Sequence, residues 1–208
     1  MTAQPKQYIT EQVYLAFERS STRKHEYFDG EIVAMSGGTV AHNLISGNMF
    51  ASLHTQLRGA GCRAFTSDLR LKVMATGLHT YPDVTVVCGH FQFVDESRDT
   101  LMNPVVIIEV LSPSTERYDR GMKFQNYRTI ATLQEYILIA QDKPQIEHYV
   151  RQASGRWIFE EAQEVTELIT LPSIHCRLAM SDVYDGVDFQ QEPTRIPSDI
   201  PPDDSQPT

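Results

Sequence analysis

A chain of 208 residues, 41% of them hydrophobic, suits one domain with a substantial core, and no stretch approaches the roughly 20 apolar residues that cross a membrane. It has no apolar secretory signal, and its scattered cysteines show neither zinc-ligand spacing nor a disulfide framework, so we expect a reducing cytoplasm; they are Cys62, Cys88 and Cys176. The net charge of −9 argues against a nucleic-acid partner, but the acidic excess lies from Glu160 onward and residues 1–159 are neutral, so polyanion binding is permitted.

The first quarter of the chain predicts a helix, a hairpin and a second helix. Residues 9–20 are amphipathic, with Thr10 in position to cap the helix. The Asp29-Gly30 pair between two apolar pairs is a strong signal for a β-hairpin over residues 25–35. The clearest helix covers residues 41–58 and ends at a glycine; its apolar stripe consists of Ile45, Met49, Leu53 and Leu57.

The rest of the chain alternates strands with helices. Residues 62–74 alternate apolar and polar side chains and predict one strand, with Leu71 on one face and Arg70 and Lys72 on the other. The further expected strands are 81–88, 105–111, 135–140, 146–150 and 157–161, and the expected helices are 115–130 and 180–184, the last capped by Ser181. Residues 190–208 are rich in Pro, Asp, Ser and Gln, which predicts a disordered acidic tail after a single domain over 1–189.

This order predicts an α/β (α+β) fold with a mixed central sheet flanked by helices. The N-terminal hairpin precedes the sheet, and a β-meander follows it. The apolar hairpin and meander could bury a neighbour's surface, so we also expect a homodimer. Fold alone does not supply a function, which has to come from particular residues.

The most informative of these residues is Glu109. It lies in the middle of an apolar run, residues 105–111, which suggests a central strand covered on both faces. An ionised carboxylate is costly to bury there unless a protein cation or a bound metal offsets its charge. Asp83 stands at the head of another apolar run, and a divalent cation shared by two acids on neighbouring strands would reverse their repulsion.

These motifs resemble the restriction-endonuclease-like, or PD-(D/E)XK, nuclease superfamily, and more closely a large bacterial family of endonuclease-like proteins. The resemblance covers residues 10 to 187. It is carried by residues 26–31, His42, residues 81–84 with Pro82-Asp83, residues 108–114 with Glu109-Val110, the helix residues Asp119, Lys123 and Tyr127, and residues 135–138.

The resemblance implies a restriction-endonuclease-like fold and a divalent metal site that hydrolyses phosphodiester bonds in DNA. Asp83 and Glu109 would hold Mg²⁺ or Mn²⁺, with a backbone carbonyl near Val110 as a third ligand. The superfamily pattern has a lysine two residues after the second acid, where this chain has Leu111. The resemblance to the closer family implies that Lys123 on the next helix takes that role.

Each of these residues has a simpler interpretation. Pro-Asp is common in turns, Glu109 could form a buried ion pair with Lys123 or an arginine, and a helix lysine is usually solvated. His42, Glu26 and Asp119 are candidates for supporting roles beside the metal. His42 could instead make a local hydrogen bond at a helix start, and Glu26 could be a surface acid on the hairpin.

Candidate nucleic-acid contacts are Arg63, Arg70 and Lys72. They lie on the predicted strand over residues 62–74, and Asp68 on that strand could add a metal ligand. The alternative, which we favour for Asp68, is that these polar side chains form a solvated, salt-bridged face. Two functions besides a DNA endonuclease stay open from the sequence: a binding module without turnover on the same fold, and a nuclease that acts on RNA.

Overall fold

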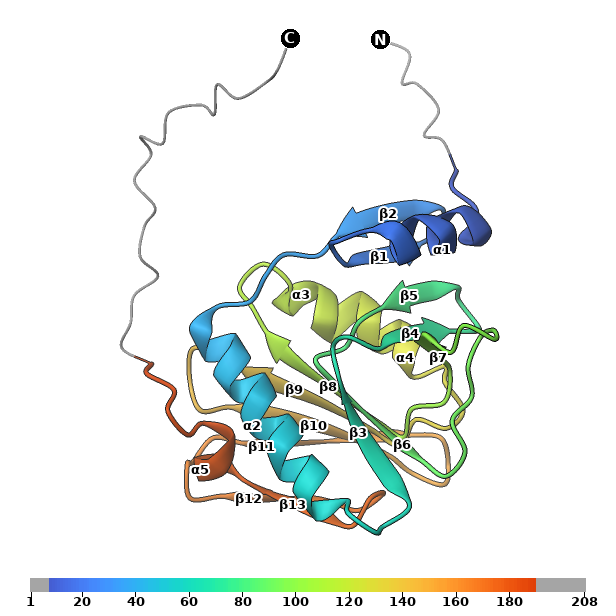
Figure 1. Cartoon of the computed structure of the whole chain (residues 1–208). Coiled ribbons are helices and arrows are strands. Elements are labelled where there is room, and N and C mark those ends of the chain that lie inside the picture. Colours follow the sequence, from blue (N-terminus) through green and yellow to red (C-terminus); the bar gives the residue numbers. More distant parts are fainter. Residues whose placement is uncertain (1–7, 190–208) are drawn as a thin grey trace, which may run out of the picture.

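The computed structural model describes residues 8–189 and contains a mixed sheet of six strands (Figure 1). Its order is β11-β10-β9-β8-β6-β3, and only the β8–β9 pair is parallel. The strands are β3 (Cys62–Thr66), β6 (Val84–Cys88), β8 (Val106–Leu111), β9 (Glu135–Ala140), β10 (Ile146–Arg151) and β11 (Trp157–Ala162). The predicted mixed central sheet with its C-terminal meander is therefore confirmed.

A second sheet of five strands, in the order β2-β1-β5-β4-β7, includes the N-terminal hairpin. Its strands are β1 (His25–Phe28), β2 (Glu31–Ala34), β4 (Arg70–Val73), β5 (Leu78–Thr80) and β7 (Thr100–Leu101). The hairpin turns at Asp29 and Gly30, whose φ angles of 47° and 78° are those of the turn that such a pair favours. A further hairpin consists of β12 (Leu168–Leu171) and β13 (Cys176–Ala179).

Helices cover both faces of the six-stranded sheet (Figure 1). The helices of the described residues are α1 (Glu11–Ser20), α2 (Val40–Gln56), α3 (Glu116–Tyr118), a π-helical turn η1 (Asp119–Lys123), α4 (Phe124–Tyr127) and α5 (Met180–Val183). The α2 helix covers one face of this sheet and the segment from α3 to α4 the other, whereas α1 packs on β1 of the five-stranded sheet and α5 on α2 and β13. The predicted stripe of α2 is fully buried and packs on the β8 face that carries Ile108 and Val110. Ile107 and Leu111 point to the opposite face, toward α4 and the five-stranded sheet.

The predicted strand over residues 62–74 is wrong, because the chain makes a tight turn at Ser67 and Asp68 and changes sheets. Lys24 holds this turn, with its Nζ 2.8 Å from the Ser67 carbonyl oxygen and 2.7 Å from Asp68. A two-residue turn preserves the alternation of apolar and polar positions, so the pattern could not reveal the break. Asp68 is exposed and salt-bridged, as favoured.

Other boundaries also differ from the prediction. The helix expected over residues 115–130 is shorter and contains a π-helical turn, and Ser181 lies inside α5 without capping it. The short strands β5, β7, β12 and β13 were not predicted. The predicted acidic tail, residues 190–208, lies outside the described residues.

The expectation for the cysteines is wrong as well. Cys62 and Cys88 face each other in the antiparallel register of β3 and β6 and form a disulfide, while Cys176 is free and buried. A separation of 26 residues does not reveal this pairing without the register. Because disulfides persist in oxidising compartments, the cysteines no longer argue for a reducing cytoplasm. Over residues 8–189, none of the helices combines the length and apolar character needed to cross a membrane.

Candidate active site

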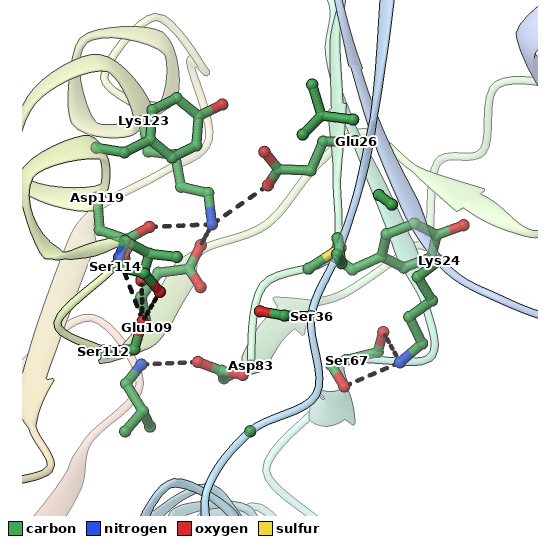
Figure 2. Close-up of a pocket in the computed structure, with 18 of the residues that line it drawn as sticks. Lys24, Glu26, Ser36, Ser67, Asp83, Glu109, Ser112, Ser114, Asp119 and Lys123 are labelled. Atoms are coloured by element: carbon green, nitrogen blue, oxygen red, sulfur yellow. Dashed lines mark hydrogen bonds and ion pairs between the residues drawn. The ribbon is translucent and has the colours of Figure 1, made fainter. Parts of the chain in front are cut away.

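The two acids lie at paired positions of neighbouring strands. Val84 pairs with Ile108 in the antiparallel register of β6 and β8, so Asp83, one residue earlier, stands opposite Glu109. The Asp83 Oδ2 atom accepts a hydrogen bond of 2.7 Å from the Val110 amide, which holds the carboxylate beside β8 (Figure 2). Both side chains border one cavity of about 830 Å³. The two acids therefore share a face of the sheet, as a common cation would require.

Lys123 supplies the cation that the pattern around Glu109 lacks. Its Nζ atom lies 3.1 Å from Glu109, 3.1 Å from Asp119 and 3.3 Å from Glu26 (Figure 2). One ammonium thus stands among three carboxylates, and Asp83 adds a fourth to the same cavity. The ion pair that was the simpler interpretation of Glu109 is present, but it leaves an excess of negative charge.

The π-helical turn brings this lysine to the sheet. A π turn widens the helix by one residue and is frequent at functional sites. Here it spans Asp119–Lys123, and the helix returns to α geometry at Phe124. Asp119, Lys123 and Tyr127 then point toward Glu109, whose Oε1 atom accepts a 2.8 Å hydrogen bond from the Tyr127 hydroxyl.

Burial governs the protonation of this cluster. The pKa of Glu109 is raised to about 8, because burial disfavours the charged carboxylate and the nearby acids Asp119 and Asp83 add to this effect, whereas Lys123 and the hydrogen bond from Tyr127 oppose it. Burial opposes the charge of Lys123 too, but Glu109, Glu26 and Asp119 together hold its pKa well above the usual value. A further cation beside Asp83 and Glu109 would relieve the repulsion and lower the pKa of Glu109.

The supporting candidates also reach the cavity. His42, in the first turn of α2, places its Nε2 atom 3.3 Å from Asp83, and although burial works against protonation, Asp83 leaves the pKa of His42 raised. Glu26 projects from β1, and Thr80 on β5 donates a hydrogen bond to it. These contacts exclude a purely exposed surface role for Glu26.

Tyr118 is a cavity residue that the sequence did not indicate. Its ring centroid lies 5.6 Å from the Lys123 Nζ atom, the geometry of a cation–π contact, and burial and the nearby Glu26 carboxylate raise the pKa of its hydroxyl. It precedes the π turn by one residue, so helical spacing of 3.6 residues per turn would have placed it away from Lys123. Only the π geometry brings it to this side.

Two of the three predicted nucleic-acid contacts are buried. Arg70 donates to Thr100 at 2.8 Å and to the Tyr81 hydroxyl at 3.1 Å. Lys72 pairs with Glu11 of α1. The prediction that these two side chains contact a nucleic acid is wrong for this structure, because the turn at residues 67–68 directs β4 into the five-stranded sheet. Arg63 is exposed but does not border the cavity.

Comparison with known proteins agrees with this geometry. A family model described as "Uma2: Putative restriction endonuclease" matches residues 11–181, and this range holds all the acids of the cavity. The chain belongs to the Uma2 family. The fold and the family membership confirm the resemblance noted from the motifs, and they support a nuclease class of activity.

Relatives and a solved structure extend the comparison. Two uncharacterised proteins of Synechocystis sp., slr1290 and sll1609, are 35% and 36% identical to the Uma2-family chain over 87% and 74% of its length, and over 94% and 86% of their own. A crystal structure of "a putative nuclease belonging to DUF820" from Anabaena variabilis superposes with a TM-score of 0.68 at 21% identity, over 85% of this chain and 97% of that one. That likeness shows the fold.

The acids of this Uma2-family protein suit a hard cation that keeps much of its water. Among residues 8–189, no three His, Cys, Asp or Glu side chains form a ready-made metal cage. Magnesium commonly takes only one or two carboxylates and completes its octahedron with waters and substrate phosphate oxygens. Asp83 and Glu109 are two such carboxylates, they occupy paired positions of neighbouring strands, and they border one cavity. The residues present therefore fit Mg²⁺ or Mn²⁺.

Proposed function

We propose that this protein is a metal-dependent nuclease that hydrolyses phosphodiester bonds in DNA. The observation that carries the proposal is the meeting of Asp83 and Glu109 on one face of two adjacent strands, with Lys123 beside them in the same cavity. Membership of the Uma2 family supports it.

The side chains divide the work. Asp83 and Glu109 would hold Mg²⁺ or Mn²⁺, which lowers the pKa of bound water and neutralises charge on the scissile phosphate. The Val110 amide and His42 orient Asp83 for this task. The Lys123 ammonium is a compact positive charge. It can stabilise the phosphate oxygens in the transition state once some of its ion pairs with the surrounding carboxylates are broken.

Two circular substrates test the proposal, because a single internal cut changes the mobility of each. With Mg²⁺ or Mn²⁺, the protein should nick supercoiled plasmid or linearise circular single-stranded DNA. The Glu109→Ala variant should lose at least about 100-fold of that rate, and chelation should abolish it. Glu160→Ala is the matched control, because Glu160 is an exposed acid on β11 away from the cavity. Equal rates for wild type and Glu109→Ala would refute the proposal.

A second candidate is a nucleic-acid-binding module without turnover. The pairing of Lys123 with three carboxylates favours it, because an ammonium held in ion pairs is not free to stabilise charge on a scissile phosphate. DNA binding that persists in Glu109→Ala, without cleavage under any metal, would select this function. Parallel assays with RNA circles test the RNA alternative.

A homodimer, a cytoplasmic location and a single domain over 1–189 also stay predictions.

A further inference from the structure

Two arginines beside the cavity have no acidic partner among residues 8–189. Arg23, in the loop before β1, and Arg117, in α3, are both exposed. No carboxylate of the described residues lies within ion-pair distance of either guanidinium. Exposed arginines without an ion-pair partner are available to a ligand. A planar guanidinium can form two parallel hydrogen bonds to one phosphate group.

The two arginines border connected hollows. Arg23 lines the catalytic cavity, whereas Arg117 lines a neighbouring groove of about 680 Å³. Ser114 borders both, so the groove continues the cavity past the end of β8. Lys24, next to Arg23, lies on the other side of Asp83 from Ser114 (Figure 2). Cationic side chains therefore stand at both ends of a path whose middle is acidic.

The middle of this path is deep and small. Glu109, Asp119 and Lys123 are buried, with at most 6% of their surface exposed. A cavity of about 830 Å³ has the size of a pocket for one small molecule. A DNA duplex is stiff over about 150 base pairs and cannot fold its phosphates into such a pocket. An unpaired strand bends at each nucleotide and can.

Apolar side chains at the rim suit an unstacked base. Val33 on β2 and Met122 in the π turn both line the cavity, yet 59% and 48% of their surfaces are exposed. Bases that leave a stack are commonly held against apolar or aromatic side chains. A duplex would leave these two side chains without a partner, since its bases are already stacked on one another.

We propose that the cavity takes an unpaired DNA strand, which runs from Arg23 past the acids to Arg117 and packs a base against Val33 and Met122. The inference rests on the proposed function for its catalytic centre and adds the substrate class. Arg23 and Arg117 hold the phosphates on either side of the scissile bond, so the central phosphate is positioned although the centre itself is acidic.

Labelled oligonucleotides of one sequence test this inference in three forms: single-stranded, fully paired, and paired with an unpaired bubble. Cleavage is followed with Mn²⁺, and binding is followed by fluorescence anisotropy with Ca²⁺. The single strand and the bubble should react at least about 10-fold faster than the duplex. The Arg23→Ala and Arg117→Ala variants should each raise the KM several-fold and reduce the slope of log affinity against log salt by about 0.7. Arg156→Ala, an exposed arginine at the β10–β11 turn, is the matched control.

The outcomes separate the two proposals. Cleavage of the duplex as fast as the single strand, or Arg23→Ala and Arg117→Ala variants that behave like Arg156→Ala, would overturn the strand path and leave the nuclease function intact. The absence of cleavage on all three forms, together with single-strand binding that both arginine variants weaken, would refute the nuclease function and support the path. Equal binding of duplex and single strand without cleavage would refute both.

Discussion

Two charge clusters in this protein, each built around a buried cation, differ in their balance. Around Arg70, two arginines face two aspartates: Arg70 lies 3.2 Å from Asp99, and Arg19 lies 2.8 Å from Asp99 and 2.7 Å from Asp95. Around Lys123, one ammonium faces three carboxylates and borders a cavity with a fourth. Burial of charge alone therefore does not mark the site. A surplus of carboxylates beside an open cavity does mark the site, because a cation that arrives with solvent or substrate can neutralise that surplus.

The largest expected effect is a loss of stability when the central cation of each cluster is removed, and the two clusters should differ in how they respond to Mg²⁺. Lys123→Met should lower the free energy of unfolding by about 3–5 kcal/mol, because it leaves buried acids uncompensated. Arg70→Met should lower it by about 1–3 kcal/mol, because it removes buried hydrogen bonds to Thr100 and Tyr81 while Asp99 is one-third exposed and keeps Arg19 as a partner. Millimolar Mg²⁺ should restore part of the loss in Lys123→Met, since a divalent ion can replace the ammonium among four carboxylates, with a gain of about 2.7 kcal/mol at 100 times the Kd. Urea unfolding with and without Mg²⁺ measures both effects.

Arg70→Met is the control for that rescue. Its acids do not border the cavity, so Mg²⁺ should leave its stability unchanged. An equal gain in both variants would mean that the ion acts on the whole protein instead of the Lys123 cluster, and no gain in either would remove the surplus of acid as a mark of a cation site.

A smaller effect concerns the proton on Glu109. Its pKa of about 8 lies above the ordinary 4.5, so the folded state holds a proton that the unfolded chain releases between these values. Stability should therefore fall as the pH rises from about 4.5 to about 8. Glu109→Gln mimics the protonated side chain and should match wild type near pH 5, yet exceed it at pH 8 by on the order of 2–3 kcal/mol without divalent ions.

Thermal unfolding of both proteins in chelator across this pH range measures the difference. Parallel curves for wild type and Glu109→Gln would contradict a raised pKa. Addition of Mg²⁺ should narrow the gap at pH 8, because the ion favours the ionised carboxylate of wild type and gains less from the amide.

The sequence alone predicted part of the site correctly and part of it incorrectly. Glu109 stood out because a single acid in an apolar strand requires a partner, and Asp83 followed because a divalent cation shared by acids on neighbouring strands would reverse their repulsion. The roles of Arg70 and Lys72 were mistaken, since a turn at residues 67–68 keeps the alternation of the pattern while it moves the chain to another sheet. Local spacing carries no information on which sheet a strand joins.

Two further features of the site depend on geometry that spacing does not encode. Lys123 could be proposed from four-residue steps along the helix, but Tyr118 reaches the cluster only through the π turn. The disulfide between Cys62 and Cys88 depends on the register of β3 against β6. In each case the signal is a long-range or irregular contact, whereas the predicted helices and strands rest on regular local patterns.

The smallest expected effect tests the outer part of the balanced cluster. Arg19 is about one-third exposed and pairs with Asp95 and Asp99, and exposed pairs contribute about 0.2–1 kcal/mol. Arg19→Ala should therefore lower the free energy of unfolding by less than about 1 kcal/mol, and 1 M salt should remove most of the difference by screening. Arg70→Met should keep its larger loss in the same salt, because buried charges are screened far less. A loss of several kcal/mol in Arg19→Ala would show that Asp99 depends on both arginines, and the cluster would then act as a unit.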